Sequence, residues 1–339
     1  MPAGGRYTVD SERDPCFGIE AYVLRDEVVG SLARVLPALG NTLVSFTAGL
    51  HGGQLEVMLT PDPEEQMPRV TRYGSPLLFP FPNRVRDATY AFKGRCYQLE
   101  VNTPEGHHIH GFVRNRPWRV KEATADGRGA RLTCAFISGA YPDVLRQYPF
   151  PFVLLVTYTL AGNTLRLSAT ARNVGTGALP MGFGIHPYFR LPLAKDGRPC
   201  DARIQVPAAR LWTLGHDKLP LGGTQPVPSD LDYRTLRPVG DAELDHLYGG
   251  LIRQGGQAVC RLLDPTARAE LSVRFGPEFP YLVVFAPAER PTVCFEPYSC
   301  ITDAINLAEH EANTGLVTLL PGQEWHGAIE FAVADVAES

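Results

Sequence analysis

The chain has 339 residues, including 33 glycines and 30 prolines, where average composition predicts about 40 residues of these two types. Because glycine and proline destabilise helix interiors, this excess excludes a helical bundle or coiled coil and favours short strands joined by turns. The hydrophobic share of 44%, the charged share of 20% and the net charge of −4 exclude a disordered polymer and a basic nucleic-acid-binding surface. Small molecules are therefore the expected partners.

The cysteines and the chain ends indicate the compartment. Seven scattered cysteines without a C-x-x-C pair predict reduced thiols rather than a zinc or redox centre. Residues 1–6 lack the apolar centre of a signal peptide, and no run of about 18 apolar residues occurs. We expect a cytoplasmic protein that contacts no membrane, built as a single domain over residues 1–339 with short loose tails at about 1–15 and 334–339.

Several segments alternate apolar and polar residues, as strands do. Residues 27–39 carry a partial helical period that Pro37 interrupts, which favours strand and turn over helix. Residues 88–101 predict a hairpin with its turn at Lys93-Gly94, and residues 152–172 predict a second hairpin that turns at 161–163.

The C-terminal half continues the pattern. Residues 258–275 predict a hairpin around Asp264-Pro265-Thr266, and the apolar run 281–286 predicts a strand buried on both faces. The sequence therefore predicts an all-β fold, a large antiparallel domain of stacked sheets.

Three histidines cluster at His107, His108 and His110. No matching Cys, Asp or Glu set accompanies them, so hydrogen-bonded or solvated histidines are favoured over a metal site, and we expect neither a metal nor a cofactor. Gly111 lets the backbone approach closely, which makes His110 the best placed of the three to face a ligand.

His186 and Glu296 are the candidate acid and base. His186 precedes Pro187 and a tyrosine, so its backbone is restricted and an aromatic wall follows it; a fixed imidazole suits general acid or base work, although a buried structural histidine is the alternative. Glu296 shares a strand face with Cys294. Burial without a counter-charge would raise its pKa and make it a better base, whereas pairing with an arginine is the alternative.

Two further places carry polar side chains. Asn83 and Arg84 follow an apolar run, where the guanidinium could hold hydroxyls or a carboxylate. Asp245 and His246 lie between an acidic segment and Gly249. Each place taken alone is weak evidence for a site.

Taken in order, these places resemble one family, the aldose 1-epimerases or galactose mutarotases. The motifs that carry the resemblance are Asn83-Arg84, His110-Gly111, His186-Pro187-Tyr188, Leu244-Asp245-His246 and Phe295-Glu296-Pro297, and the similarity extends from about Val29 to Val333. The resemblance implies a galactose mutarotase-like β-sandwich with an open sugar cleft on a concave sheet.

The same resemblance implies residue roles. Glu296 would be the base on the anomeric hydroxyl and His186 the acid on the ring oxygen, while Arg84, His110 and Asp245 would hold hydroxyls or developing charge. Asn83 accompanies Arg84 in the motif. The implied reaction is the interconversion of α and β anomers of a free aldohexose such as glucose or galactose, and it needs neither metal nor nucleotide.

Three alternatives remain open, and the oligomeric state and the physiological sugar are not predicted. The hexose-6-phosphate mutarotases resemble the chain near Gly111-Phe112-Val113-Arg114, although Asn83-Arg84 and His186-Pro187 favour an unphosphorylated sugar. A non-catalytic sugar-binding module would be expected to lack the acid or the base. A lyase or glycosidase on a similar sandwich would need a second carboxylate, for which Asp245 is the candidate.

Overall fold

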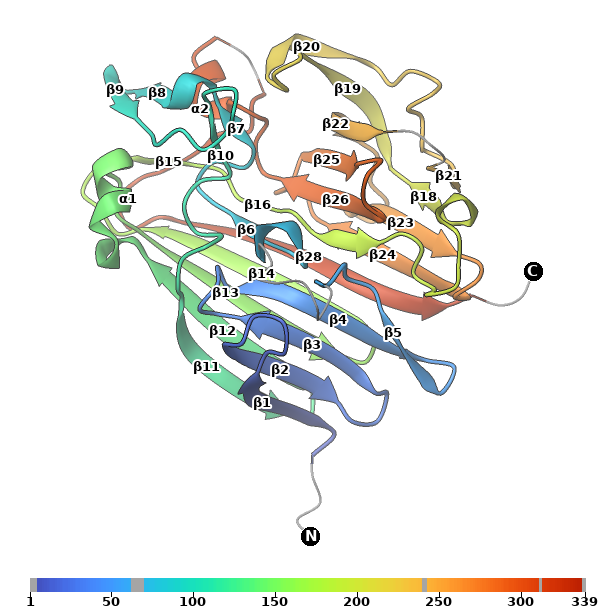
Figure 1. Ribbon diagram of the computed structural model, residues 1–339. Helices are drawn as coiled ribbons and strands as arrows, with labels where there is room; N and C mark the ends of the chain where they lie inside the picture. Colours follow the sequence, from blue (N-terminus) through green and yellow to red (C-terminus); the bar gives the residue numbers. More distant parts are fainter. Residues whose placement is uncertain (1–4, 62–69, 240–242, 311–312, 337–339) are drawn as a thin grey trace.

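The protein is described by a computed structural model over residues 5–61, 70–239, 243–310 and 313–336 (Figure 1). Strands make up nearly all of its regular structure, and every ladder between two named strands is antiparallel. This confirms the predicted all-β, antiparallel fold. No helix among the described residues is both long and apolar enough to cross a membrane.

The first sheet is formed by consecutive strands near the N-terminus. Its order is β1 (Tyr7–Arg13), β2 (Glu20–Asp26), β3 (Ser31–Leu36), β4 (Thr42–Leu50) and β5 (Gly53–Glu56). Strand β3 lies within residues 27–39, as the strand-and-turn interpretation predicts.

The expectation of loose tails needs correction at both ends. Strand β1 pairs with β2 from Tyr7 to Arg13, and the last strand continues to Asp335. Strand β1 is polar and only its first residue is buried, because it is an edge strand held by backbone hydrogen bonds. Its sequence therefore lacks the apolar alternation that marks a buried strand. Residues 1–4 and 337–339 lie outside the described residues.

The largest sheet stacks against the first sheet, through contacts of β1 and β2 with β11, β12 and β13 (Figure 1). Its strands, in spatial order, are β11 (Arg119–Asp126), β12 (Gly129–Ile137), β13 (Phe152–Ala161), β14 (Thr164–Asn173), β28 (Glu324–Asp335), β24 (Ala269–Phe275), β23 (Ala258–Asp264), β18 (Arg203–Gln205) and β21 (Arg237–Pro238).

The third sheet carries the candidate site residues His186, Asp245 and Glu296 on or beside its strands. Its order is β20 (Pro220–Pro226), β19 (Ala208–Leu214), β22 (Leu244–Leu251), β25 (Tyr281–Ala286), β26 (Thr292–Tyr298), β16 (Gly184–Ile185) and β6 (Leu77–Leu78), with β17 (Tyr188–Arg190) also paired to β26. Phe189 of β17 contacts Phe331 of β28, so this sheet packs on the largest one.

Short elements complete the described chain. Three small ladders join β7 (Arg84–Val85) to β10 (His108–Ile109), β8 (Thr89–Phe92) to β9 (Arg95–Gln98), and β15 (Leu179–Met181) to β27 (Val317–Leu319). The helices are α1 (Pro142–Gln147), α2 (Ala304–Leu307) and 3-10 turns at Val70–Arg72, Arg86–Ala88, Ser138–Ala140 and Pro199–Asp201.

The predicted hairpins are confirmed. Strands β8 and β9 turn at Lys93-Gly94, β13 and β14 turn at Gly162-Asn163, and β23 and β24 turn after Asp264. Strand β25 coincides with the apolar run 281–286 and is buried on both faces. Turn residues and alternation therefore located these elements correctly.

Candidate functional site

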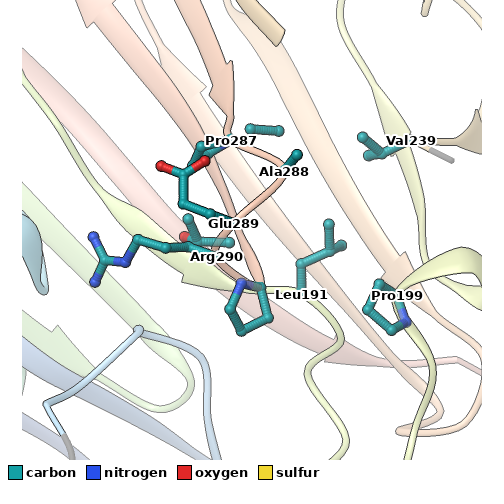
Figure 2. A pocket seen from close by; sticks show the side chains of 10 residues that line it. Leu191, Pro199, Val239, Pro287, Ala288, Glu289 and Arg290 are labelled. Atoms are coloured by element: carbon teal, nitrogen blue, oxygen red, sulfur yellow. The ribbon is translucent and has the colours of Figure 1, made fainter. Parts of the chain in front are cut away.

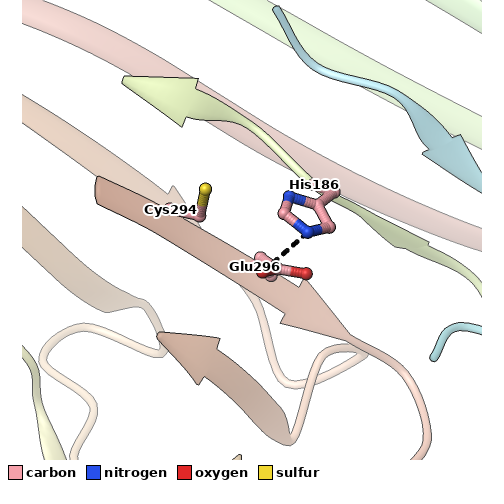
Figure 3. Close-up of side chains that lie close together, drawn as sticks. All are labelled: His186, Cys294 and Glu296. Carbon is pink, nitrogen blue, oxygen red and sulfur yellow. Dashed lines mark ion pairs between the residues drawn. The ribbon is translucent and has the colours of Figure 1, made fainter. Parts of the chain in front are cut away.

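Strand β26 carries the candidate base, and every residue of this strand is buried. Side chains two residues apart on a strand point to the same face, so Cys294, Glu296 and Tyr298 share one side. Figure 3 shows Cys294 and Glu296 on this strand, with His186 beside the carboxylate. His186 follows β16, which pairs with β26, so sheet pairing brings the two candidate residues together.

The carboxylate and the imidazole are in direct contact. Oε1 of Glu296 lies 3.3 Å from Nε2 of His186, and the two side chains are 1% and 12% exposed. The other oxygen of Glu296, Oε2, accepts a hydrogen bond of 2.5 Å from the Tyr298 hydroxyl. The sequence analysis did not single out Tyr298, although its spacing of two from Glu296 on a strand was the available signal.

Burial shifts the pKa values of both Glu296 and His186. It raises the pKa of Glu296 well above the usual value, against the opposing hydrogen bond from Tyr298. Burial, together with the positive charge of Arg114, lowers the pKa of His186 to about 3. Burial therefore favours the uncharged form of both groups, with the proton of the pair on the carboxyl group. The contact itself favours the ionic form, so the proton is shared between two coupled groups.

An aromatic stack holds the imidazole. The ring of Tyr188 lies parallel to His186, with centroids 4.4 Å apart, and its hydroxyl lies 3.4 Å from Nε2. The Arg290 guanidinium lies over the rings of Tyr188 and Tyr73, at 5.5 and 5.0 Å. The segment after β16, whose backbone Pro187 restricts, thus places His186 against the Tyr188 ring, and Arg290 covers that ring.

Arg290 also lines a hollow of about 400 Å³ around the connection between β25 and β26 (Figure 2). Leu191, Pro199, Val239 and Pro287 contribute much of its apolar wall. Neither Glu296 nor His186 lines this hollow, so it is separate from the acid–base pair.

Two hydrogen bonds connect His110 and Asn83 where their chain segments meet. Both residues have positive φ angles, 68° for His110 and 64° for Asn83. The Asn83 backbone N–H donates to Nδ1 of His110, and the His110 N–H donates to the Asn83 carbonyl. The proton of a neutral His110 is therefore on Nε2. The ring of His110 lies 5.6 Å from that of His186.

Arg84 is oriented by Asn83. Oδ1 of Asn83 accepts hydrogen bonds from the backbone N–H of Arg84 and from its Nη1, at 2.9 and 3.3 Å. The buried Nε of Arg84 has no hydrogen-bond partner among the described residues. Asn83 therefore acts on the guanidinium directly, and Arg84 retains an unused donor.

Asp245 lies on the same sheet face as Glu296. It pairs with Phe285 across β22 and β25, and Phe285 pairs with Cys294 across β25 and β26; directly paired residues in antiparallel strands share a face. Its carboxylate lies 3.2 Å from Nζ of Lys218 and is 27% exposed. Asp245 is thus a more accessible carboxylate than Glu296.

Arg114 is a cation near the acid and base. From the sequence, it was considered only through the resemblance to hexose-6-phosphate mutarotases. Its charge lowers the pKa of both His110 and His186, and no carboxylate among the described residues is paired with its guanidinium. Burial lowers its own pKa.

One group of potential metal ligands occurs in the described part of the chain. The ligand atoms of His186, Cys294 and Glu296 lie within 4.8 Å of one another (Figure 3). Burial raises the pKa of the Cys294 thiol well above its usual value, so the thiol is protonated. In the histidine cluster, Nδ1 of His107 accepts from the Asp87 N–H and Nδ1 of His108 contacts the Glu100 carbonyl.

These features define a class of protein, an antiparallel β-sandwich with a buried carboxylate–imidazole pair on one sheet. Solved structures of galactose mutarotase-like proteins share this fold. A galactose mutarotase-like protein of Clostridium acetobutylicum is 20% identical and covers 98% of this chain and 99% of its own, with a TM-score of 0.88. The galactose 1-epimerase of Lactobacillus acidophilus NCFM is also 20% identical and covers 98% and 100%, with a TM-score of 0.76.

Sequence comparison identifies the family. The aldose 1-epimerase family model matches residues 23–332, and the chain belongs to that family. An uncharacterized Escherichia coli K12 protein, YihR, is 27% identical over 271 residues, which cover 78% of this chain and 82% of that protein. The family and fold expected from the ordered motifs are thus confirmed.

Proposed function

We propose that the protein is an aldose 1-epimerase that interconverts the α and β anomers of a free aldohexose such as glucose or galactose. The observation that carries the proposal is the contact between Oε1 of Glu296 and Nε2 of His186. The two oxygens involved in ring opening, O1 and O5, are both bonded to C1 of the sugar. A base and an acid that serve them must therefore lie close together.

The proposed reaction needs one proton on the pair. Opening starts from the ionic form of the pair: Glu296 takes the proton of the O1 hydroxyl while His186 gives its proton to O5, the C1–O5 bond breaks, and C1=O1 becomes an aldehyde. Rotation about C1–C2 and the reverse transfers close the ring on the other face. The two groups exchange protonation states between opening and closure, which suits a pair that shares one proton.

The surrounding polar groups would hold the sugar. Arg84, with its unused Nε donor, and His110, with a proton on Nε2, offer donors to hydroxyl oxygens. Asp245 offers an acceptor on the same sheet face. Asn83 would contribute by orienting Arg84.

Polarimetry tests the proposal. Fresh α-D-glucose and α-D-galactose should relax to their equilibrium rotation faster with the protein, and Glu296→Gln and His186→Ala should each lower kcat by about 10²- to 10⁴-fold. Matched controls are Glu122→Gln on the exposed strand β11 and His326→Ala on β28, which should keep wild-type rates. Wild-type rates in both site variants would refute the assigned roles.

A second candidate is a hexose-6-phosphate mutarotase, favoured by the guanidinium of Arg114, which is paired with no carboxylate among the described residues. Anomer exchange followed by NMR on matched free and 6-phosphorylated aldoses would distinguish the two. A strong preference for the phosphate, lost in Arg114→Gln, would support this candidate. Saturable sugar binding without exchange of any aldose would instead indicate a non-catalytic binding module.

A further inference from the structure

We infer that Tyr298 is a positioning residue, whose hydroxyl engages one oxygen of Glu296 and so reserves the other oxygen for proton transfer. The inference rests on the proposed function for its catalytic consequence. Its structural part concerns the state of the Glu296 carboxyl group, which can be measured without any sugar.

The two carboxylate oxygens of Glu296 have different surroundings. Oε2 accepts the Tyr298 hydroxyl at 2.5 Å. Oε1 is buried, has no hydrogen-bond partner among the described residues, and lies 3.3 Å from Nε2 of His186. A buried acceptor without a donor is costly and unusual, so Oε1 is the oxygen left open to a proton-bearing group.

The Tyr298 ring reaches this place because the facing strand has no side chain there. Gly184 of β16 pairs directly with Tyr298 of β26. A Cβ atom at Gly184 would lie 2.5 Å from Cδ1 and 2.9 Å from Cε1 of the tyrosine ring. The φ angle of Gly184 is not positive, so the glycine supplies space rather than a special backbone conformation.

A second glycine makes room for a nearby side chain just after β26. A Cβ atom at Gly182 would lie 2.2 Å from Sγ of Cys300. The Gly182-Phe183-Gly184 segment thus accommodates the side chains of Tyr298 and Cys300, two residues apart.

The hydrogen bond also controls the charge of the carboxyl group. Burial raises the pKa of Tyr298 well above 10, so the hydroxyl remains a donor throughout the working range of pH. A donor to a carboxylate stabilises its ionised form, and the Tyr298 bond lowers the pKa of Glu296 against the effect of burial. Loss of the donor should therefore raise the pKa of Glu296 further and free the carboxyl group to rotate.

Tyr298→Phe tests the inference, because it removes the hydroxyl and keeps the ring. We expect kcat for mutarotation to fall by about 10- to 100-fold with KM changed by less than about 2-fold, since no sugar contact is lost. The limb of the pH–rate profile that belongs to Glu296 should move to higher pH. Wild-type kcat together with a wild-type pH profile would overturn the inference.

Tyr158→Phe is the matched control. Tyr158 is fully buried, and its hydroxyl donates to the Asn41 carbonyl at 2.9 Å, outside the site. It should lose stability to a similar degree as Tyr298→Phe while keeping the kcat and the pH profile of the wild type. Equal kinetic losses in both variants would mean a general structural effect and would contradict the positioning role.

Gly184→Ala provides a second route that keeps the tyrosine. The added methyl group should displace the ring and move the same limb of the pH profile in the same direction. Because both changes act on one hydrogen bond, the double variant with Tyr298→Phe should show little further shift. Fully additive shifts, or no shift in Gly184→Ala, would count against the inference.

Infrared titration separates this inference from the proposed function. The difference between wild-type and Glu296→Gln spectra reports the ionisation of the Glu296 carboxyl group without substrate. Tyr298→Phe should move this ionisation to higher pH even if no aldose is epimerised. An unchanged ionisation would overturn the inference, whatever the outcome of polarimetry.

Discussion

Glu296 shows what a reactive carboxylate requires of a folded chain. It is 1% exposed and contacts an imidazole of lowered pKa rather than a guanidinium. Burial without a permanent positive partner raises its pKa, and no arginine among the described residues forms the salt bridge that was the alternative. The site therefore holds a base at a cost in stability, a common compromise at functional sites.

This cost predicts a pH-dependent gain in stability for Glu296→Gln. The pKa of the carboxyl group is raised in the folded state, so the stability that its proton contributes is present below the unfolded pKa of about 4.3 and is lost as pH rises through the folded pKa. The free energy of unfolding of the variant, relative to wild type, should increase over that range by about 1.4 kcal/mol per unit of pKa difference.

Urea unfolding at a series of pH values measures this difference. Glu122→Gln, an exposed glutamate on β11, is the control and should give a nearly constant difference from wild type. A constant difference for Glu296→Gln would contradict the raised pKa.

At the scale of elements, close crossings of backbone hold the polar groups above the third sheet. Gly111 follows His110 and lies against Phe79 of the segment after β6, where the Phe112 N–H donates to the Phe79 carbonyl. A Cβ atom at Gly111 would lie 2.1 Å from that carbonyl oxygen, and its φ angle is +64°. The crossing thus fixes the backbone that presents His110.

Gly111→Ala should therefore destabilise the protein by about 3 kcal/mol or more, from the strained φ angle and from the overlap with backbone. Gly94→Ala is the matched control, because Gly94 has a φ angle of +72° with nothing within 4 Å of an added Cβ, and it should cost only about 1 to 2 kcal/mol. Denaturant unfolding of both variants measures the contrast. Equal losses would show that the φ angle alone accounts for the effect.

At the scale of the whole molecule, the core extends across all three large sheets. One buried cluster includes Leu24 of the first sheet, Phe331 of the largest and Phe295 of the third. This packing encloses four free cysteines of the described structure: Cys134, Cys260, Cys294 and Cys300.

Thiol labelling of the native protein should follow this burial. Cys96 and Cys200 are exposed and should react rapidly with a thiol reagent, whereas the four buried thiols should react only after unfolding. Mass spectrometry after timed labelling identifies each site. Rapid native labelling of Cys294 would indicate that the face carrying Glu296 is open to solvent and would contradict its burial.

Local patterns predicted the local structure. Turn residues located three hairpins, and the ordered motifs identified the family. Long-range pairing was not predictable, because strand β28 lies between β14 and β24 through backbone hydrogen bonds that any strand could form. Tyr298 was missed for a related reason: its partner is two residues away, but its place depends on Gly184, more than a hundred residues earlier. The single-domain organisation and the roles of the site residues stay predictions.

The match between Gly184 and Tyr298 has a consequence for related sequences. The two positions face each other across one ladder, so they are expected to change together: a chain with a side chain at the first position should carry a smaller residue at the second. In such a chain, the glutamate would need a hydrogen-bond donor from another residue. The identity of one residue in a short glycine segment would then sort relatives by how their carboxylate is held, before any of their structures is known.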